Sequence, residues 1–250
     1  MADSNVQQVM EKIYEAHGGI SPWRKLEAVE AVISVRGFLF KAKRRPILSR
    51  VRVRAAVRKP EFIFYDYPSP GRNSVFLGNE EVHITDSGHQ VLVNRQQPRA
   101  AIRGLRRQLY WDALDFTYFG GYATWNYLVT PFLFSSDEFK IDMLEPRSTD
   151  PDYPVRLQVE FPPDFPTHCR KQIFYFDRDF LLRRLDYTAE VVSRFARAAH
   201  ICEDYHEFDG LKFPTKRRVR PLVIGSKPLP RPVIVAIDIH ELHLKEAAHV

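Results

Sequence analysis

The run from His200 to His206 is the densest cluster of chemically reactive side chains in the sequence. If the run is a strand, one face carries four potential metal ligands: His200, Cys202, Asp204 and His206. Alternate strand residues lie about 6.6–6.8 Å apart, so two neighbours can reach one ion but the two ends cannot. A further ligand would have to come from His168 or His240 on another strand. Because polar strand faces more often hydrogen-bond to their neighbours, we expect no metal site and no cofactor.

His168, Tyr187 and His200 are the candidate acid–base residues. His168 precedes a predicted strand, where a histidine near a cavity mouth could act as a general base. Tyr187 and His200 fall on predicted neighbouring strands and could form an acid–base pair. The alternative is structural, with a hydrogen-bonded histidine and an ordinary cross-strand pair. The sequence alone leaves both interpretations open.

Two basic segments could bind an anion. The first lies within residues 41–59 and alternates three arginines with apolar residues, in the order Arg50, Val51, Arg52, Val53, Arg54 and Ala55. This alternation predicts a strand with its arginines in solvent and its valines in the core. The second is Lys216 to Arg220, which could hold an anionic head group but is more typical of a solvated strand. No nucleic-acid motif accompanies the net charge of +6, so we expect no nucleic-acid partner.

The hydrophobic patterns predict an α+β protein that is mainly β. A helix is expected over 4–17, ended by Gly18-Gly19, with a short helix from Trp23 to Leu26. The predicted strands are 31–40, 49–57, 61–67, 73–77, 80–85, 89–94, 138–145, 154–161, 171–177, 180–192, 198–208, 211–220 and 232–244. Turns at Gly78-Asn79 and Asp209-Gly210 should each join adjacent strands. Such short turns favour a curved antiparallel sheet, an incomplete barrel, over βαβ units.

Residues 98–134 interrupt the strand pattern. Aromatic side chains crowd into 111–134, and the spacing fits two short helices parted by Gly120-Gly121. A solvated connection would not expose this many aromatic side chains to water. We therefore expect a helical aromatic cap over the open side of the sheet. The residues that we predict to contact a ligand there are Trp111, Tyr118, Tyr122, Trp125 and Tyr127.

The composition fits one globular domain spanning residues 1–250. The polar start has no basic segment followed by an apolar run, and no apolar stretch approaches the ~18 residues that a membrane span needs. Nothing in the spacing of Cys169 and Cys202 demands a disulfide. We therefore expect a cytoplasmic protein, and the oligomeric state stays undetermined.

The order of elements resembles the LolA/LolB-like lipoprotein-carrier superfamily. The likeness rests on His17-Gly18-Gly19 followed by Trp23 to Leu26, and on the later segments Phe176 to Leu182, Leu185 to Tyr187 and Asp209 to Thr215. It implies a half-barrel closed by helices over an apolar cavity. Those carriers are exported and this sequence shows no export signal, so only the cavity is carried over.

A closer likeness is to a group of bacterial and fungal proteins of about this length. It rests on Tyr118 to Tyr127, which reads YFGGYATWNY, and on Asp209 to Arg218, which reads DGLKFPTKRR. This second likeness implies no particular activity.

Three functions are compatible with these patterns. The first is binding of a small hydrophobic molecule, lipid-like or polyketide-like, because ligand pockets are mostly apolar with few polar groups. The second is an enzyme on the same cavity, a cyclase, isomerase or hydrolase of an apolar metabolite that uses His168, Tyr187 and His200. The third is an anion- or nucleic-acid-binding module, which only the charge supports.

Overall fold

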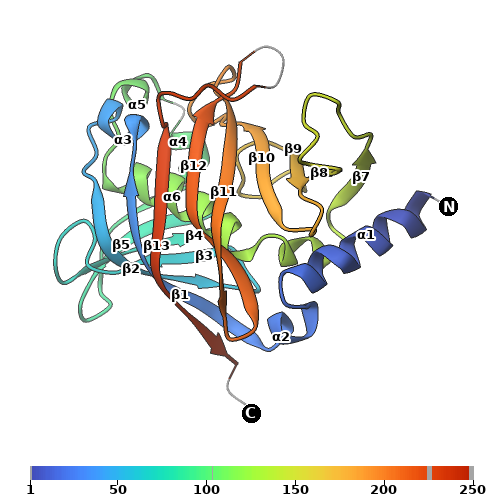
Figure 1. Cartoon of the computed structure of the whole chain (residues 1–250). Coiled ribbons are helices and arrows are strands. Elements are labelled where there is room, and N and C mark those ends of the chain that lie inside the picture. Colours follow the sequence, from blue (N-terminus) through green and yellow to red (C-terminus); the bar gives the residue numbers. More distant parts are fainter. Residues whose placement is uncertain (1, 103, 224–226, 248–250) are drawn as a thin grey trace.

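Thirteen antiparallel strands form one curved sheet that does not close into a barrel (Figure 1). The computed structural model describes residues 2–102, 104–223 and 227–247. The strand order is β6-β5-β4-β3-β2-β1-β13-β12-β11-β10-β9-β8-β7. The first six strands therefore form a meander on one side and the last seven form a meander on the other. They meet where β1 pairs with β13.

The strands follow the predicted positions closely. Their bounds are β1 Leu26–Arg36, β2 Leu48–Ala56, β3 Glu61–Phe64, β4 Arg72–Leu77, β5 Glu81–Asp86, β6 Val91–Gln96, β7 Lys140–Leu144, β8 Val155–Glu160, β9 Lys171–Phe176, β10 Leu182–Thr188, β11 Arg197–Phe208, β12 Leu211–Pro221 and β13 Val235–Glu246. Gly78-Asn79 joins β4 to β5, and Asp209-Gly210 joins β11 to β12. Both turn predictions are confirmed, as is the curved antiparallel sheet.

The helices are short except for the first and the sixth. Their bounds are α1 Ala2–Ala16, α2 Ile20–Arg24, α3 Phe38–Ala42, α4 Pro98–Ala101, α5 Leu105–Leu109, α6 Ala113–Val129 and the 3-10 helix η1 Phe132–Ser135. The predicted N-terminal helix is confirmed. Within the described residues, no helix combines the length and the apolar character that crossing a membrane requires.

The first predicted strand ends earlier than the sequence indicated. We expected strand over 31–40, but β1 ends at Arg36 and residues 38–42 form α3. Gly37 causes the change, because its φ of +145° is a conformation that other residues rarely adopt. The backbone then turns against residues 233 and 234, whose carbonyls accept from the N–H groups of Phe38 and Leu39 at 3.1 Å.

The aromatic segment forms one long helix where we expected two. Helix α6 runs without a break through Gly120-Gly121. These glycines let the helix approach the sheet, because a Cβ on Gly121 would lie 2.6 Å from the Cβ of Phe76. The helix begins at a capping box in which Asp112 and Asp115 each accept from the other's backbone N–H.

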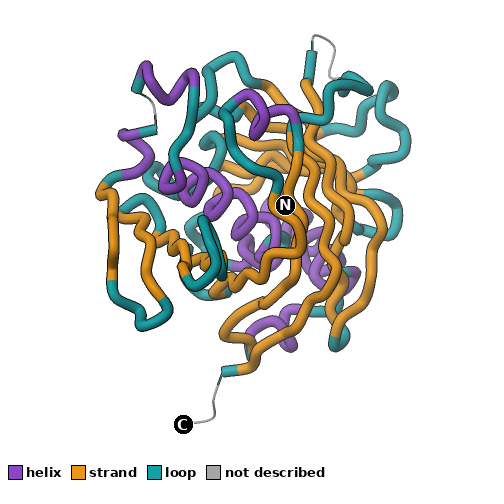
Figure 2. The backbone as a smooth tube through the Cα atoms, turned by 90° about the vertical axis from the view of Figure 1, so that its left-hand side faces the viewer, coloured by secondary structure: helices purple, strands orange, loops and turns teal. Residues whose placement is uncertain are grey.

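Helix α6 is buried along its length, from Leu114 to Val129. Figure 2 shows it lying inside the curve of the sheet, with strands on both sides. It packs against β3 and β4 in particular. The expected aromatic segment therefore does cover the inner face of the sheet, but as a central core helix.

The basic face of β2 is solvated at two of its three arginines. Arg50 and Arg52 are exposed and Val53 is fully buried, as predicted, whereas Arg54 and Val51 are half-buried. Each arginine has a local partner: Arg50 pairs with Glu241, Arg54 with Glu27 at 2.5 Å, and Arg52 lies 4.4 Å above the ring of Tyr65. The three arginines are thus satisfied within the sheet, which argues against an anion site at β2.

Candidate functional site

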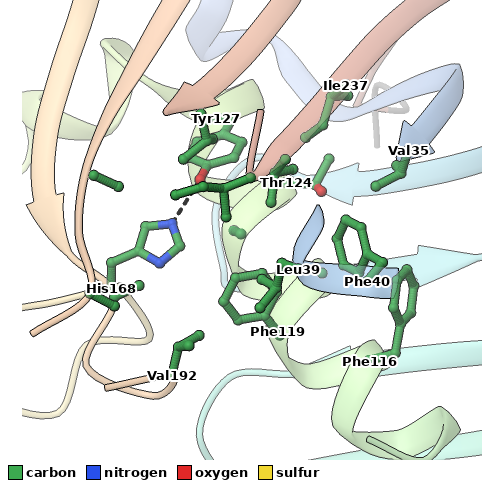
Figure 3. Close-up of a pocket in the computed structure, with 18 of the residues that line it drawn as sticks. Val35, Leu39, Phe40, Phe116, Phe119, Thr124, Tyr127, His168, Val192 and Ile237 are labelled. Atoms are coloured by element: carbon green, nitrogen blue, oxygen red, sulfur yellow. Dashed lines mark hydrogen bonds between the residues drawn. The ribbon is translucent and has the colours of Figure 1, made fainter. Parts of the chain in front are cut away.

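An apolar cavity of about 70 Å³ lies between α6 and the inner face of the sheet (Figure 3). Helix α6 contributes Phe116, Phe119 and Ala123 to its wall, and α3 contributes Leu39 and Phe40. The opposite wall comes from β1, β11, β12 and β13 through Val35, Ala198, Val219 and Ile237. The turn at Gly37 matters here, because it starts the short helix that places Leu39 and Phe40 at the cavity.

Four polar side chains line this cavity, namely Thr124 and a connected group of three. Tyr127 of α6, His168 of the loop before β9, and Tyr187 of β10 all line it. The Tyr127 hydroxyl lies 2.7 Å from His168 Nε2 and 3.1 Å from the Tyr187 hydroxyl. The Tyr122 hydroxyl lies 3.0 Å from His168 Nδ1. Three phenols and one imidazole therefore form a continuous hydrogen-bonded chain, and Figure 3 shows the link from Tyr127 to His168.

Burial keeps this chain uncharged at neutral pH. The rings of His168 and Tyr187 stack with centroids 4.0 Å apart. Burial, aided by the Arg99 charge, lowers the pKa of His168 to about 3. Burial also raises the pKa of Tyr187 well above its usual range. His168 accordingly donates from one ring nitrogen and accepts at the other.

His200 is buried beside this chain but does not join it. Its ring meets the ring of Tyr127 at a centroid distance of 4.3 Å and an angle of 89°. Neither ring nitrogen has a hydrogen-bond partner among the residues that the structure describes. Burial lowers the pKa of His200 well below its usual value. His200 lies diagonally from Tyr187, since β10 and β11 pair Leu185 with His200, and no hydrogen bond joins the two candidate residues.

The fold has known counterparts among solved structures. A LolA superfamily protein from Nitrosomonas europaea superposes with a TM-score of 0.51 at 11% identity, covering 94% of this chain and 93% of that one. The chain has a LolA-like fold. A DUF1329 family protein from Desulfovibrio piger gives a TM-score of 0.49 at 13% identity, covering 95% and 93%. No protein-family model and no curated protein matches the chain.

Within this LolA-like half-barrel, the predicted ligand-contacting aromatics take different places. Tyr127 lines the cavity, and Tyr122 reaches it only through His168. The hydroxyl of Tyr118 donates to Asn79 at 2.7 Å, and Nε1 of Trp125 donates to the carbonyl of Ala56 at 2.7 Å. Trp111 packs against Phe119 with ring centroids 4.9 Å apart. Trp111, Tyr118 and Trp125 thus hold α6 in place, away from the cavity wall.

Sequence reasoning missed the aliphatic part of the wall. Leu39 fell inside a predicted strand, and Val35 and Ala198 looked like ordinary strand residues. The alternation of apolar residues predicts that these side chains are buried. It does not predict on which side of the sheet a cavity opens. Only the position of α6 identifies that side.

The four potential metal ligands between His200 and His206 do not share one face of β11 in the structure. His200 and Cys202 are buried, whereas Asp204 and His206 are exposed and lie 3.4 Å apart at the surface. The expectation of one shared face was wrong because Asp204 has a φ of +58°. This left-handed residue reverses the alternation, so Tyr205 turns inward instead. Its hydroxyl donates to the carbonyl of Leu182 at 2.5 Å. Among the described residues, no three potential ligands converge on a metal site.

The hydrogen-bonded chain makes Tyr127 more important for stability than Tyr187. Tyr127→Phe leaves both His168 and Tyr187 short of a buried partner, and each such loss costs about 1–3 kcal/mol. We expect the free energy of unfolding to fall by about 2–6 kcal/mol. Tyr187→Phe keeps the link from Tyr127 to His168, so its cost should stay near about 1 kcal/mol. Urea denaturation of both variants measures the difference, and equal losses would contradict the central place of Tyr127.

Proposed function

We propose that this protein binds a small hydrophobic molecule, lipid-like or polyketide-like, in the cavity beside α6. The supporting observation is the composition of the wall. Apolar side chains from α3, α6 and five strands surround the space, and only a few hydroxyl and imidazole groups line it. This distribution is typical of ligand sites, where apolar walls supply affinity and a few polar groups fix orientation.

The cavity volume limits what can bind without movement. At about 70 Å³ it accommodates only a small group. A larger ligand requires that part of the wall moves outward. Two parts of the wall outside the strand ladder are α3 and the loop between β10 and β11, which contributes Ala189, Val192 and Ala196. Such segments can move at a lower free-energy cost than the strands, because few ladder hydrogen bonds hold them.

The second candidate is an enzyme that acts on an apolar molecule in the same cavity. An imidazole and two phenols line the space, which favours this idea. The pKa values of these groups argue against an enzymatic function. A general base works best with a pKa near the working pH, whereas that of His168 is lowered to about 3. The buried phenol of Tyr187 is correspondingly a weak acid. Binding is therefore the function that the site supports better.

A cavity-filling substitution tests the proposal. Ala198→Leu adds three carbon atoms at the cavity wall, and Ala100→Leu makes the same change at an exposed position of α4. An uncharged apolar fluorescent probe should bind the wild type and Ala100→Leu equally. Its affinity for Ala198→Leu should fall at least about tenfold, a loss of about 1.4 kcal/mol.

Thermal denaturation provides the check on folding. Because the new side chain occupies empty space, the melting temperature of Ala198→Leu should not fall. If the probe binds Ala198→Leu as well as the wild type, the ligand site lies elsewhere. If the probe binds neither protein, the proposed function is wrong.

A further inference from the structure

Arg217 of β12 is a cation inside the half-barrel. Its side chain is 2% exposed, whereas its neighbour Lys216 lies in solvent. Nη2 donates to the carbonyl of Tyr127 at 2.6 Å, and Nη1 donates to Cys202 Sγ at 3.4 Å. The guanidinium also lies 5.4 Å from the Tyr127 ring centroid. All of these partners are neutral, and the described part of the chain supplies no carboxylate that pairs with Arg217.

A buried charge without a counter-charge is unfavourable. Arginine stays protonated under ordinary conditions, so burial cannot neutralise it as it neutralises histidine. Transfer of an unpaired ion from water to a protein interior costs several kcal/mol. In addition, Nε of Arg217 is buried and finds no hydrogen-bond partner in the described part of the chain. The guanidinium therefore has both an uncompensated charge and an unused donor.

A second, smaller cavity adjoins Arg217. It measures about 10 Å³, and Asn126, Gln172 and Thr130 contribute polar groups to its lining. Tyr127 and His168 line this cavity as well as the larger apolar one. The two spaces thus share a wall, and a single amphipathic molecule that occupies both must displace the contact between Tyr127 and His168. Asn126 Oδ1 is also buried with no hydrogen-bond partner in residues 2–102, 104–223 and 227–247, so a water or a ligand hydroxyl could complete the lining.

We propose that Arg217 binds the carboxylate of an amphipathic acid whose apolar part occupies the larger cavity. This inference rests on the proposed function and specifies the class of ligand. A carboxylate would accept from Nε and would neutralise the guanidinium, which a water molecule cannot do. An anionic head-group site in the segment Lys216 to Arg220 was one interpretation of the sequence. Of the four cations in that segment, Arg217 alone is fully buried in the structure.

The test compares ligands that differ only in the head group. Octanoate, octanol and methyl octanoate would each displace a neutral apolar fluorescent probe from the protein at pH 8. The wild type should bind octanoate at least about tenfold more tightly than octanol, because a hydrogen bond to a charged group contributes about 1.5–3 kcal/mol. This comparison requires no variant and therefore cannot be confused with misfolding.

Variants then assign the preference to Arg217. Arg217→Met keeps the length of the side chain and removes the charge, and Lys216→Met removes a charge from the exposed side of the same strand. Arg217→Met should lose the preference for octanoate and still bind octanol within about threefold of the wild type. Lys216→Met should keep the wild-type preference, and Arg217→Lys should keep part of it.

The outcomes separate the two proposals. If the wild type binds octanol and octanoate alike, or if Arg217→Met keeps the preference, then Arg217 is not a carboxylate site, while the proposed function stands. If the wild type binds neither the probe nor any of the three ligands, both proposals are wrong.

Discussion

At pH 5 the protein should be about 6 kcal/mol less stable than at pH 8, because three buried histidines stay neutral in the folded state. His17, His168 and His200 are each at most 2% exposed. Burial lowers the pKa of His17 to about 4 and that of His168 to about 3, and it lowers the pKa of His200 well below its usual value. An unfolded chain restores a pKa near 6.5 to each of them.

The direction of the effect follows from proton uptake. At pH 8, well above 6.5, these histidines are neutral in both states, so their contribution to stability no longer changes with pH. As the pH falls from 6.5 towards 4, the unfolded chain binds protons that the folded chain cannot bind. Each histidine then favours unfolding, by about 2 kcal/mol at pH 5. The loss continues until the pH reaches the lowered pKa values of the folded state.

Urea denaturation at pH 8 and pH 5 measures this loss. His168→Gln removes one of the three groups, so the difference between the two pH values should shrink to about 4 kcal/mol. His206→Gln is the matched control, because the side chain of His206 is 58% exposed. It should leave the difference unchanged. A full 6 kcal/mol loss in His168→Gln would show that His168 is not held neutral.

Gly37→Ala should reduce the free energy of unfolding by about 3–5 kcal/mol, because two independent penalties add at this position. A φ of +145° is strained for any residue with a Cβ. The new Cβ would also lie 2.2 Å from the carbonyl oxygen of Ile234, which belongs to the backbone and cannot move aside cheaply.

Gly71→Ala separates the two penalties. Gly71 has a φ of +73°, and a Cβ added there would meet no atom within 4 Å, so only the backbone strain applies, about 1–2 kcal/mol. Gly37→Ala should also weaken binding of the apolar probe, because Gly37 positions the α3 residues of the cavity wall. Equal losses of stability in the two variants would show that contact with Ile234 is unimportant.

Local patterns in the sequence were sufficient to predict most of the sheet. The alternation of Arg50 to Ala55 correctly placed Arg50 and Arg52 in solvent and Val53 in the core, since adjacent strand residues point to opposite faces. Gly78-Asn79 and Asp209-Gly210 identified two hairpins, because few residue pairs adopt the required backbone angles. These features depend on residues close together in the chain.

Single residues with unusual backbone angles caused errors that no local pattern revealed. Gly37 ended β1 and began a helix, and Asp204 reversed the alternation of β11. Gly120-Gly121 looked like a break between helices but lies inside α6. In that helix Gly121 allows close packing against Phe76 and Gly120 against Phe64, residues more than 40 positions earlier in the sequence.

The candidate site depends on long-range packing even more strongly. The sequence singled out Tyr127, His168 and Tyr187, but their hydrogen bonds join a helix, a loop and a strand that are separated by up to 60 positions. The sequence likewise identified a basic run at Lys216 to Arg220 without showing which cation is buried. That distinction arises because β12 places Arg217 on the same side as α6, where water is excluded and a charge requires a partner.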